Sequence, residues 1–149
     1  MSERRIAITS DHAGYHLKEG LIEYFRKEEG ILLSDLGTYS DESVDYPDFA
    51  HRIAQDIEEG RYDMGITICG SGNGISMTAN KHQGIRSALC WCEEIGRLAR
   101  AHNDANICAL PGRFIDLPQA VVIVKTFLNT SFDGGRHARR VKKIPLSGV

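Results

Sequence analysis

The feature that most constrains the fold is a regular alternation of short apolar runs with amphipathic stretches along the whole chain. Short runs bounded by turn residues indicate strands, and apolar residues spaced at i, i+3 and i+4 indicate helices. Strands that alternate with helices of this length predict βαβ units, and therefore a mostly parallel sheet that is covered on both faces. The expected strands are residues 5–10, 31–37, 64–69, 85–91 and 106–112, and the expected helices lie within 17–25, 49–57, 75–79, 93–102, 117–128 and 134–144.

The 149 residues suit one domain with a single core, and no repeat, low-complexity tract or linker divides them. We expect this domain to span residues 1–149. Right-handed crossovers between parallel strands give an α/β fold, a Rossmann-like three-layer sandwich with about five strands and a C-terminal helix. In such folds, ligands bind beyond the carboxyl ends of the strands, where the strand order reverses. The polar segments to examine there are 9–14, 37–42, 69–74 and 111–113, and 101–104 closes the fourth helix as a further polar cluster.

Composition narrows the class of protein. The formal net charge is −2, so there is no electrostatic argument for nucleic acid or an anionic membrane as a partner. The apolar part of the N-terminus is too short for a secretory signal, and no apolar run approaches membrane-spanning length. We therefore expect a cytoplasmic protein whose four cysteines are reduced thiols. Cys90 and Cys92 alternate on an expected strand without zinc-ligand spacing, so we expect both to be small buried side chains.

A glycine-rich segment, ICGSGNGIS at residues 68–76, follows the third expected strand. The dinucleotide-binding fingerprint G-x-G-x-x-G fails there, because Ile75 stands where the third glycine belongs. Ile75 also occupies the position at which a cysteine phosphatase needs an arginine, and the lysine of a P-loop is absent. These three familiar nucleotide or phosphate sites are thereby excluded.

The strand, glycine turn and helix still point backbone N–H groups and a helix N-terminus at one place, which stabilises an anion. Gly70, Gly72 and Gly74 permit positive φ and a close approach of a ligand to the backbone. Cys69 stands beside this anion-binding turn as a candidate for chemistry. On the pattern alone, a structural turn with an inert core cysteine remains a competing interpretation.

Two further pairs of polar residues lie at the ends of expected elements. Asp11 and His12 follow the first strand at the expected ligand edge, where Asp11 could also simply cap the next helix. His102 and Asn103 close the fourth helix, where a histidine also serves as a C-terminal charge. Each pair taken alone fits a structural role as well as a functional one.

The C-terminal segment carries a basic helix face. Arg136, Arg139, Arg140 and Lys143 recur at i, i+3, i+4 and i+7 behind two glycines. Such a face is usually only solvated, but paired arginines also suit a phosphate dianion. Near the predicted strand ends, a thiol, two histidines, an acid and these arginines could therefore converge on the anion-binding turn.

Together these residues resemble the type B ribose-5-phosphate isomerases and their relatives that act on galactose 6-phosphate. The matching stretches are SDHAGYHLK, DLGTYSDESVDYPDFA, GITICGSGNGISMTANK, GIRSALC, ARAHNDANICALPGR and FDGGRHARRV. They run from the first expected strand to the last helix, so the resemblance covers nearly the whole chain. The combination of CGSGNGIS with HND and GGRH, in this order, is highly specific.

The resemblance implies an enzyme, an intramolecular oxidoreductase that interconverts an aldose phosphate and a ketose phosphate through a cis-enediolate, without a metal or other cofactor. The implied substrates are ribose 5-phosphate and ribulose 5-phosphate of the pentose phosphate pathway. One chain carries the whole residue set, whereas the galactose-6-phosphate enzymes pair two different chains. A six-carbon substrate, allose 6-phosphate or galactose 6-phosphate, stays open as the alternative, as does a sugar-phosphate-binding regulatory module without turnover.

The family also implies roles for individual residues. Cys69 would move the proton, because the acidic residue that some members carry at the position of Ile75 is absent. His102, aided by Ser71, would assist ring opening, and backbone N–H groups would hold the enediolate. Asp11 would bind sugar hydroxyls, and His12 and the arginines would hold the phosphate. The implied catalytic residues are Cys69, His102 and Ser71; the implied substrate contacts are Asp11, His12, Gly70, Gly72, Asn73, Gly74, Asn103, Arg113, Arg136 and Arg140, and no metal ligand is implied.

In this family the site is shared across a dimer, so the resemblance implies a homodimer or a dimer of dimers. His102, Asn103 and Arg113 are the residues that we expect from the partner chain. The implied ligand is a small sugar phosphate, and neither nucleic acid nor a membrane is an expected partner.

Overall fold

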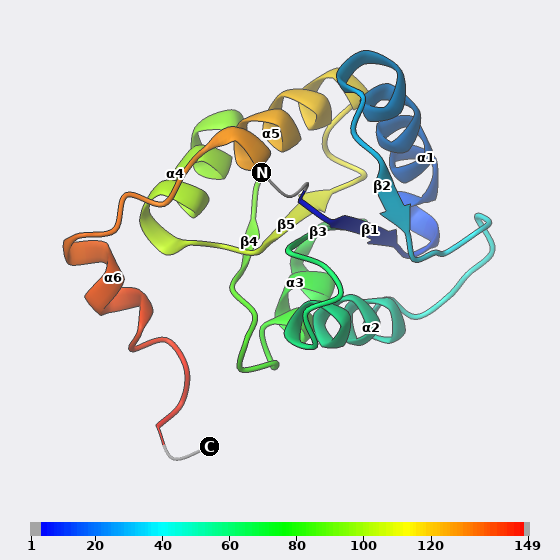
Figure 1. Cartoon of the computed structure of the whole chain (residues 1–149). Coiled ribbons are helices and arrows are strands. Elements are labelled where there is room, and N and C mark those ends of the chain that lie inside the picture. Colours follow the sequence, from blue (N-terminus) through cyan, green and yellow to red (C-terminus); the bar gives the residue numbers. More distant parts are fainter. Residues whose placement is uncertain (1–3, 148–149) are drawn as a thin grey trace.

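The computed structural model describes residues 4–147 and contains one five-stranded sheet in which all neighbouring strands are parallel (Figure 1). The strands are β1 (Ile6–Ser10), β2 (Leu33–Asp35), β3 (Met64–Cys69), β4 (Ser87–Leu89) and β5 (Ile107–Pro111). Their order across the sheet is β2-β1-β3-β5-β4. The parallel α/β fold predicted from the alternation of apolar runs is confirmed.

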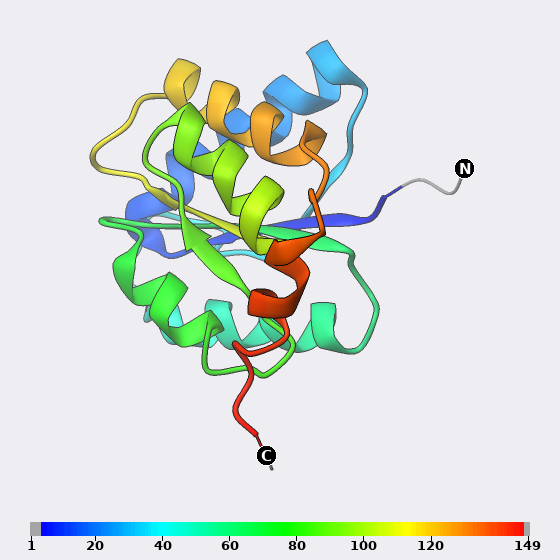
Figure 2. The ribbon, with the colours of Figure 1, turned by 90° about the vertical axis from the view of Figure 1, so that its left-hand side faces the viewer.

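Helices cover both faces of the sheet and complete the three layers (Figure 2). On one face lie α1 (Tyr15–Tyr24), α4 (Glu93–Asn103) and α5 (Leu117–Asn129), and on the other lie α2 (Tyr46–Glu58) and α3 (Asn73–Ala79). A 3₁₀ turn, η1 (His12–Gly14), precedes α1, a π-helical turn, η2 (Phe25–Glu29), extends it, and α6 (Arg136–Val141) lies beside α4. Across residues 4–147, no helix has both the length and the apolar character needed to cross a membrane.

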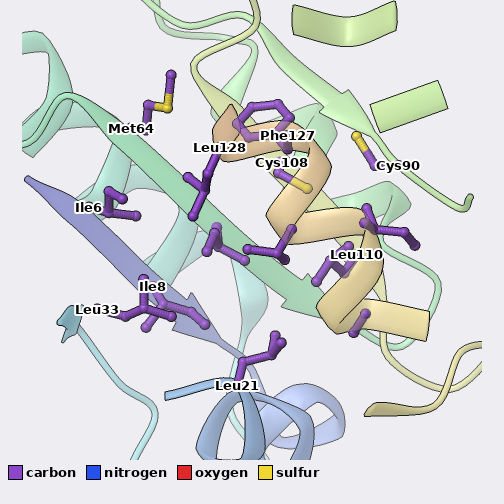
Figure 3. Packing of buried hydrophobic residues seen from close by; sticks show 14 of the residues in the cluster. Ile6, Ile8, Leu21, Leu33, Met64, Cys90, Cys108, Leu110, Phe127 and Leu128 are labelled. Carbon is purple, nitrogen blue, oxygen red and sulfur yellow. The ribbon is translucent and has the colours of Figure 1, made fainter. Parts of the chain in front are cut away.

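Alternate side chains of the central strands point to opposite faces and build two apolar layers. Ile8, Ile66 and Ile68 are fully buried in the larger cluster, which α1 and α5 cover (Figure 3). Ala7 and Cys69 face the other way, toward α2 and α3. Burial of one isoleucine side chain contributes about 1.5–3 kcal/mol, so packing holds the central strands in place. The residues that follow these strands are therefore presented on a rigid edge.

The two outermost strands are shorter than their apolar runs predict. β2 keeps three residues of the expected 31–37, and β4 keeps three of the expected 85–91. An edge strand pairs with a neighbour on one side only, so fewer backbone hydrogen bonds hold its ends in the sheet. Cys90 is fully buried as expected, but the expectation for Cys92 is wrong: this residue is partly exposed where the chain turns into α4.

The strand order reverses at β1. The chain passes from β1 outward to β2 and then crosses back over β1 to β3, and from β3 it continues past β5 to β4, so the connections that follow β1 and β3 lead to opposite sides of the sheet. In open α/β sheets, a crevice for ligands forms at such a reversal, outside the carboxyl ends of the strands. Since β1 ends at Ser10 and β3 ends at Cys69, the residues that follow both strands lie at this reversal.

Candidate active site

Cys69 is the last residue of β3 and lies in the middle of the carboxyl edge of the sheet. On one side, the Asp11 amide donates a hydrogen bond to the Ile68 carbonyl at 3.1 Å. On the other side, the Gly112 amide donates to the Cys69 carbonyl at 2.8 Å. These bonds extend both ladders past the ends of the strands, so Asp11 and Gly112 flank Cys69.

The Cys69 side chain lies in a small apolar layer beneath this edge. It packs with Ala50, Ile75 and Ala109 and is 4% exposed. Ile75 is fully buried there and supplies an apolar wall for the thiol. Burial alone also fits an inert core cysteine, so the groups around the thiol decide between the two interpretations.

The glycine loop, residues 70–74, connects β3 to α3 and leaves backbone amides free. Gly72 has a left-handed φ of 79° and stands at the N-cap of α3 without a side-chain cap. The Asn73 amide donates to Ser71 Oγ at 3.2 Å. Among the described residues, no partner is found for five other amides, those of Gly70, Ser71, Gly72 and Gly74 and that of Ile75, which follows the loop. A cluster of unpaired amides at a helix start binds an anion, so the loop has the donors that were expected of it.

Arg113 follows β5 and lies over the start of the glycine loop. Its amide donates to the Gly70 carbonyl at 3.0 Å, and its Nη1 lies 3.3 Å from the place where a Cβ on Gly70 would stand. Arg113 therefore contacts the glycine loop of its own chain, whereas the resemblance led us to expect it from a partner chain. Because β5 is the neighbour of β3, the turn after β5 folds onto the loop of its own chain.

Asp11 and His12 present polar atoms at the same edge. Oδ1 of Asp11 accepts hydrogen bonds from the amides of Ala13 at 3.0 Å and Gly14 at 3.2 Å, so its capping role is confirmed. Within residues 4–147, Oδ2 of Asp11 makes no hydrogen bond and can accept one from a ligand hydroxyl. The Val44 amide donates to His12 Nδ1 at 3.2 Å, which leaves Nε2 of the neutral ring as a donor.

Tyr46 is a residue of this site that the sequence interpretation missed. It begins α2, and its ring carbons Cε1 and Cζ lie 2.5 Å from the place where a Cβ on Gly74 would stand. The ring therefore packs directly on the glycine loop. In the sequence, Tyr46 with Pro47 marks only a helix start, because the packing of α2 on α3 is a tertiary contact.

A second group of expected site residues lies at the opposite edge of the sheet: His102, Asn103, Arg136 and Arg140. α4 runs back from the end of β4 and finishes at Asn103, just before β5 begins. Figure 1 shows α6, which carries both arginines, beside α4 and away from the arrowhead of β1. Within one chain, the expected convergence of all site residues does not occur, because this group and Cys69 lie at opposite ends of the strands.

His102 stacks on His137, with ring centroids 4.2 Å apart and planes at 11°. The Asp133 amide donates to the Ala101 carbonyl at 2.9 Å and so holds the segment before α6 against the end of α4. Loss of hydration, followed by repulsion from His102 and Arg136, lowers the pKa of His137. The ligand atoms of His102, Asp133 and His137 lie within 4.8 Å of one another and could hold a divalent ion, although parallel rings do not direct their nitrogens at a common point.

Comparisons with known proteins agree with this architecture. Residues 6–144 match the model of the Ribose/Galactose Isomerase family. The chain belongs to this family. It is 40% identical over 141 residues to ribose-5-phosphate isomerase B of Escherichia coli, and the alignment covers 95% of this chain and 94% of that relative.

Two solved structures of family members show the same fold. A ribose 5-phosphate isomerase from Thermotoga maritima is 52% identical with a TM-score of 0.93, covering 97% of this chain and 99% of the other. Ribose-5-phosphate isomerase B from Mycoplasma genitalium, solved with bound ribulose-5-phosphate, is 42% identical with a TM-score of 0.88, covering 94% and 93%. The expectation of a Rossmann-like enzyme of the sugar-phosphate isomerase class is confirmed.

Proposed function

We propose that this family member interconverts ribose 5-phosphate and ribulose 5-phosphate through a cis-enediolate. The observation that carries the proposal is the position of Cys69, a thiol that directly precedes a run of unpaired backbone amides. An aldose–ketose proton transfer needs a base and an oxyanion site side by side. Similarity to ribose-5-phosphate isomerases, one of them solved with ribulose-5-phosphate, supports this choice of substrate.

One base can carry the proton in both directions. The Cys69 thiolate removes the proton from C2 of the open-chain aldose, and the electron pair moves through C1 to the carbonyl oxygen. Both oxygens of the cis-enediolate then face the amides of the glycine loop. The thiol returns the proton to C1 while the O2 proton passes to O1, and the ketose forms. Between residues 69 and 75, Cys69 is the one ionisable side chain, so the role falls to it.

The groups beside Cys69 would bind the rest of the substrate. Oδ2 of Asp11 would accept a hydrogen bond from a sugar hydroxyl. Nε2 of His12 and the guanidinium of Arg113 would hold the phosphate, because both donate hydrogen bonds at this edge. Ser71 and Asn73, within the glycine loop, would contact the sugar near the reacting carbons.

A second copy of the chain would complete the site. His102, Asn103, Arg136 and Arg140 lie at the opposite edge of their own chain, so they can reach a glycine loop only in another protomer. A dimer with twofold symmetry forms two identical sites of this kind. In that arrangement His102 would assist ring opening, and the two arginines would add to the phosphate contacts of His12 and Arg113.

Turnover of ribose 5-phosphate, followed with and without EDTA, tests the reaction. We expect turnover that EDTA leaves unchanged and that Cys69→Ala abolishes. Cys90→Ala is the matched control, since Cys90 is buried in the other apolar layer. Full activity of Cys69→Ala would refute the assigned base.

Two companion measurements separate the alternatives. Comparing kcat/KM on ribose 5-phosphate and allose 6-phosphate decides between a five-carbon and a six-carbon substrate. Binding of ribose 5-phosphate without exchange of the C2 proton in heavy water would identify a binding module in place of an enzyme.

Mixing two inactive variants tests the shared site. Cys69→Ala and His102→Ala should each be inactive as pure proteins. After unfolding and refolding together in equal amounts, half of the dimers are mixed, and each of these has one intact site. We therefore expect about a quarter of the wild-type activity to return. A mixture that stays inactive, with wild type refolded in parallel as the control, contradicts sharing between protomers.

A further inference from the structure

Lys18 is a buried lysine outside the site described above, and it connects α1 to the end of β2. Its side chain is fully buried, and Nζ donates hydrogen bonds of 2.8 Å to Asp35 Oδ1 and to Glu19 Oε1. The ring centroids of Tyr15 and Tyr39 lie 5.4 and 5.8 Å from Nζ. Burial of an ammonium group is costly even when it is paired, so the position calls for an explanation.

A continuous path of hydrogen bonds runs from this ammonium to the end of β1. Asp35 Oδ1, which accepts from Nζ, also accepts from the Gly37 amide at 2.9 Å. The Gly37 carbonyl accepts from the Ser10 amide at 2.8 Å and from Thr9 Oγ1 at 2.7 Å. The Thr38 amide donates to the Ser10 carbonyl at 2.8 Å. Both the amide and the carbonyl of Ser10, the last residue of β1, are therefore hydrogen-bonded to this turn. Ser10 immediately precedes Asp11, the carboxylate of the site.

The segment between β2 and α2, which contains this turn, also contacts the second polar residue of the site, His12. Residues 38–45 follow the anchored turn and lead into α2. Near the end of this segment, the Val44 amide donates to His12 Nδ1 at 3.2 Å. The turn held by Lys18 thus bonds Ser10 directly, and the segment that leaves this turn bonds His12 through Val44.

We propose that Lys18 is a positioning residue that fixes Asp11 and His12 relative to Cys69. The inference rests on the proposed function, because it gives Lys18 a part in the geometry of that same site. Replacement of a buried ion pair by apolar side chains is often neutral or stabilising, so net stability alone does not account for a lysine here. Because the buried Lys18 ammonium needs the Asp35 carboxylate as its partner, it favours the one arrangement in which Asp35 also holds the Gly37 turn over the end of β1.

Three variants test this role. Lys18→Met removes the ammonium but keeps most of the side-chain volume. Asp35→Asn keeps an oxygen for the Gly37 amide and removes the charge that Lys18 meets, and it serves as the second variant if Lys18→Met does not fold. Glu19→Gln is the matched control, because Glu19 is half exposed and bonds Lys18 without touching the path to Ser10.

The expected result is a roughly tenfold to hundredfold loss of kcat with ribose 5-phosphate in Lys18→Met and a smaller loss in Asp35→Asn. Glu19→Gln should keep wild-type turnover. The alkylation rate of Cys69, mapped by mass spectrometry, should stay at the wild-type value in all three variants, because β3 itself is undisturbed. A general loosening of the fold would raise that rate, and this outcome would overturn the positioning role.

Hydrogen exchange gives a readout that does not depend on turnover. Amides of residues 9–14 and 37–39 should exchange faster in Lys18→Met than in wild type, and Glu19→Gln should match wild type. If wild type shows no isomerase turnover, the proposed function fails while this measurement still decides the role of Lys18. Unchanged exchange at residues 9–14, or unchanged kcat in Lys18→Met, overturns the proposal.

Discussion

The ring of Tyr46 lies against Gly74, with two ring carbons 2.5 Å from the place where a Cβ on this glycine would stand. Gly74 does not have a left-handed φ, so the contact with the ring, and not the backbone conformation, is what excludes a side chain. The amide of Gly74 is one of the unpaired donors of the glycine loop. The position of this donor is therefore coupled to the packing of α2 on α3.

Gly74→Ala should displace the Tyr46 ring or the loop amides. We expect kcat/KM for ribose 5-phosphate to fall about tenfold or more, because a small misplacement of the donors weakens their contact with the enediolate. The Tm should change little, since Tyr46 is 39% exposed and its ring can turn toward solvent. Tyr46→Ser in the same chain should restore part of the loss in a double-mutant cycle. Additive losses would show that the two residues do not act together.

Gly72 and Gly60 share a φ of 79° but differ in their surroundings. A Cβ on Gly72 would overlap the Leu89 side chain and stand 3.1 Å from the Leu110 carbonyl oxygen, whereas a Cβ on Gly60 would meet nothing within 4 Å. Gly60→Ala should lower the free energy of unfolding by about 1–2 kcal/mol, the cost of left-handed backbone alone. Gly72→Ala should cost about 2 kcal/mol more and abolish turnover. Urea denaturation of both variants measures the difference, and equal losses would contradict the steric argument.

The central strands and the residues that end them could be predicted from the sequence. β1 and β3 are buried on both faces, so their apolar runs are unbroken and their ends are sharp. That is why Asp11 and Cys69 could be placed on one edge before any contact was known. The short edge strands β2 and β4 were less well predicted, because burial constrains them on fewer sides.

Contacts between elements could not be predicted in this way. Arg113 reaches the glycine loop because β5 lies next to β3, although β4 comes between them in the chain. Lys18 reads as one polar position of an amphipathic helix, and its burial depends on the neighbouring end of β2. His102 lies at the opposite edge because α4 runs antiparallel to the strands. These positions are set by strand order and helix packing, and the local spacing of apolar residues in the sequence does not reveal either one.

The stacked pair of His102 and His137 predicts a pH dependence of stability. Lost hydration, and then repulsion from His102, lowers the pKa of His137 in the folded chain. In the unfolded chain His137 has its ordinary pKa of about 6.5, so between the two values the unfolded state binds more protons. This contribution to stability is complete above about pH 6.5 and is lost as the pH falls through the lowered pKa. His137→Gln should flatten that part of the curve of unfolding free energy against pH.

An NMR titration of the His137 ring checks the direction of its pKa. His102→Gln should move this pKa part of the way back toward about 6.5, because the lost hydration remains as the larger cause. A His137 pKa above that of an unfolded peptide would contradict the assigned cause.

Arg113 lies over Gly70 with its Nη1 3.3 Å and its Cδ 3.4 Å from the position of a Cβ there, so its side chain lies against the start of the loop. Arg113→Lys keeps the charge but loses the fork that binds two phosphate oxygens at once. If Arg113 holds the phosphate, the KM for ribose 5-phosphate should rise about tenfold, corresponding to one lost charge-assisted hydrogen bond, while kcat falls less. Arg61→Lys is the matched control, since Arg61 is exposed and pairs with Asp56 at the far end of α2. Inhibition by inorganic phosphate should weaken in Arg113→Lys alone. A loss confined to kcat, with phosphate inhibition unchanged, would place Arg113 with the reacting carbons instead of the phosphate.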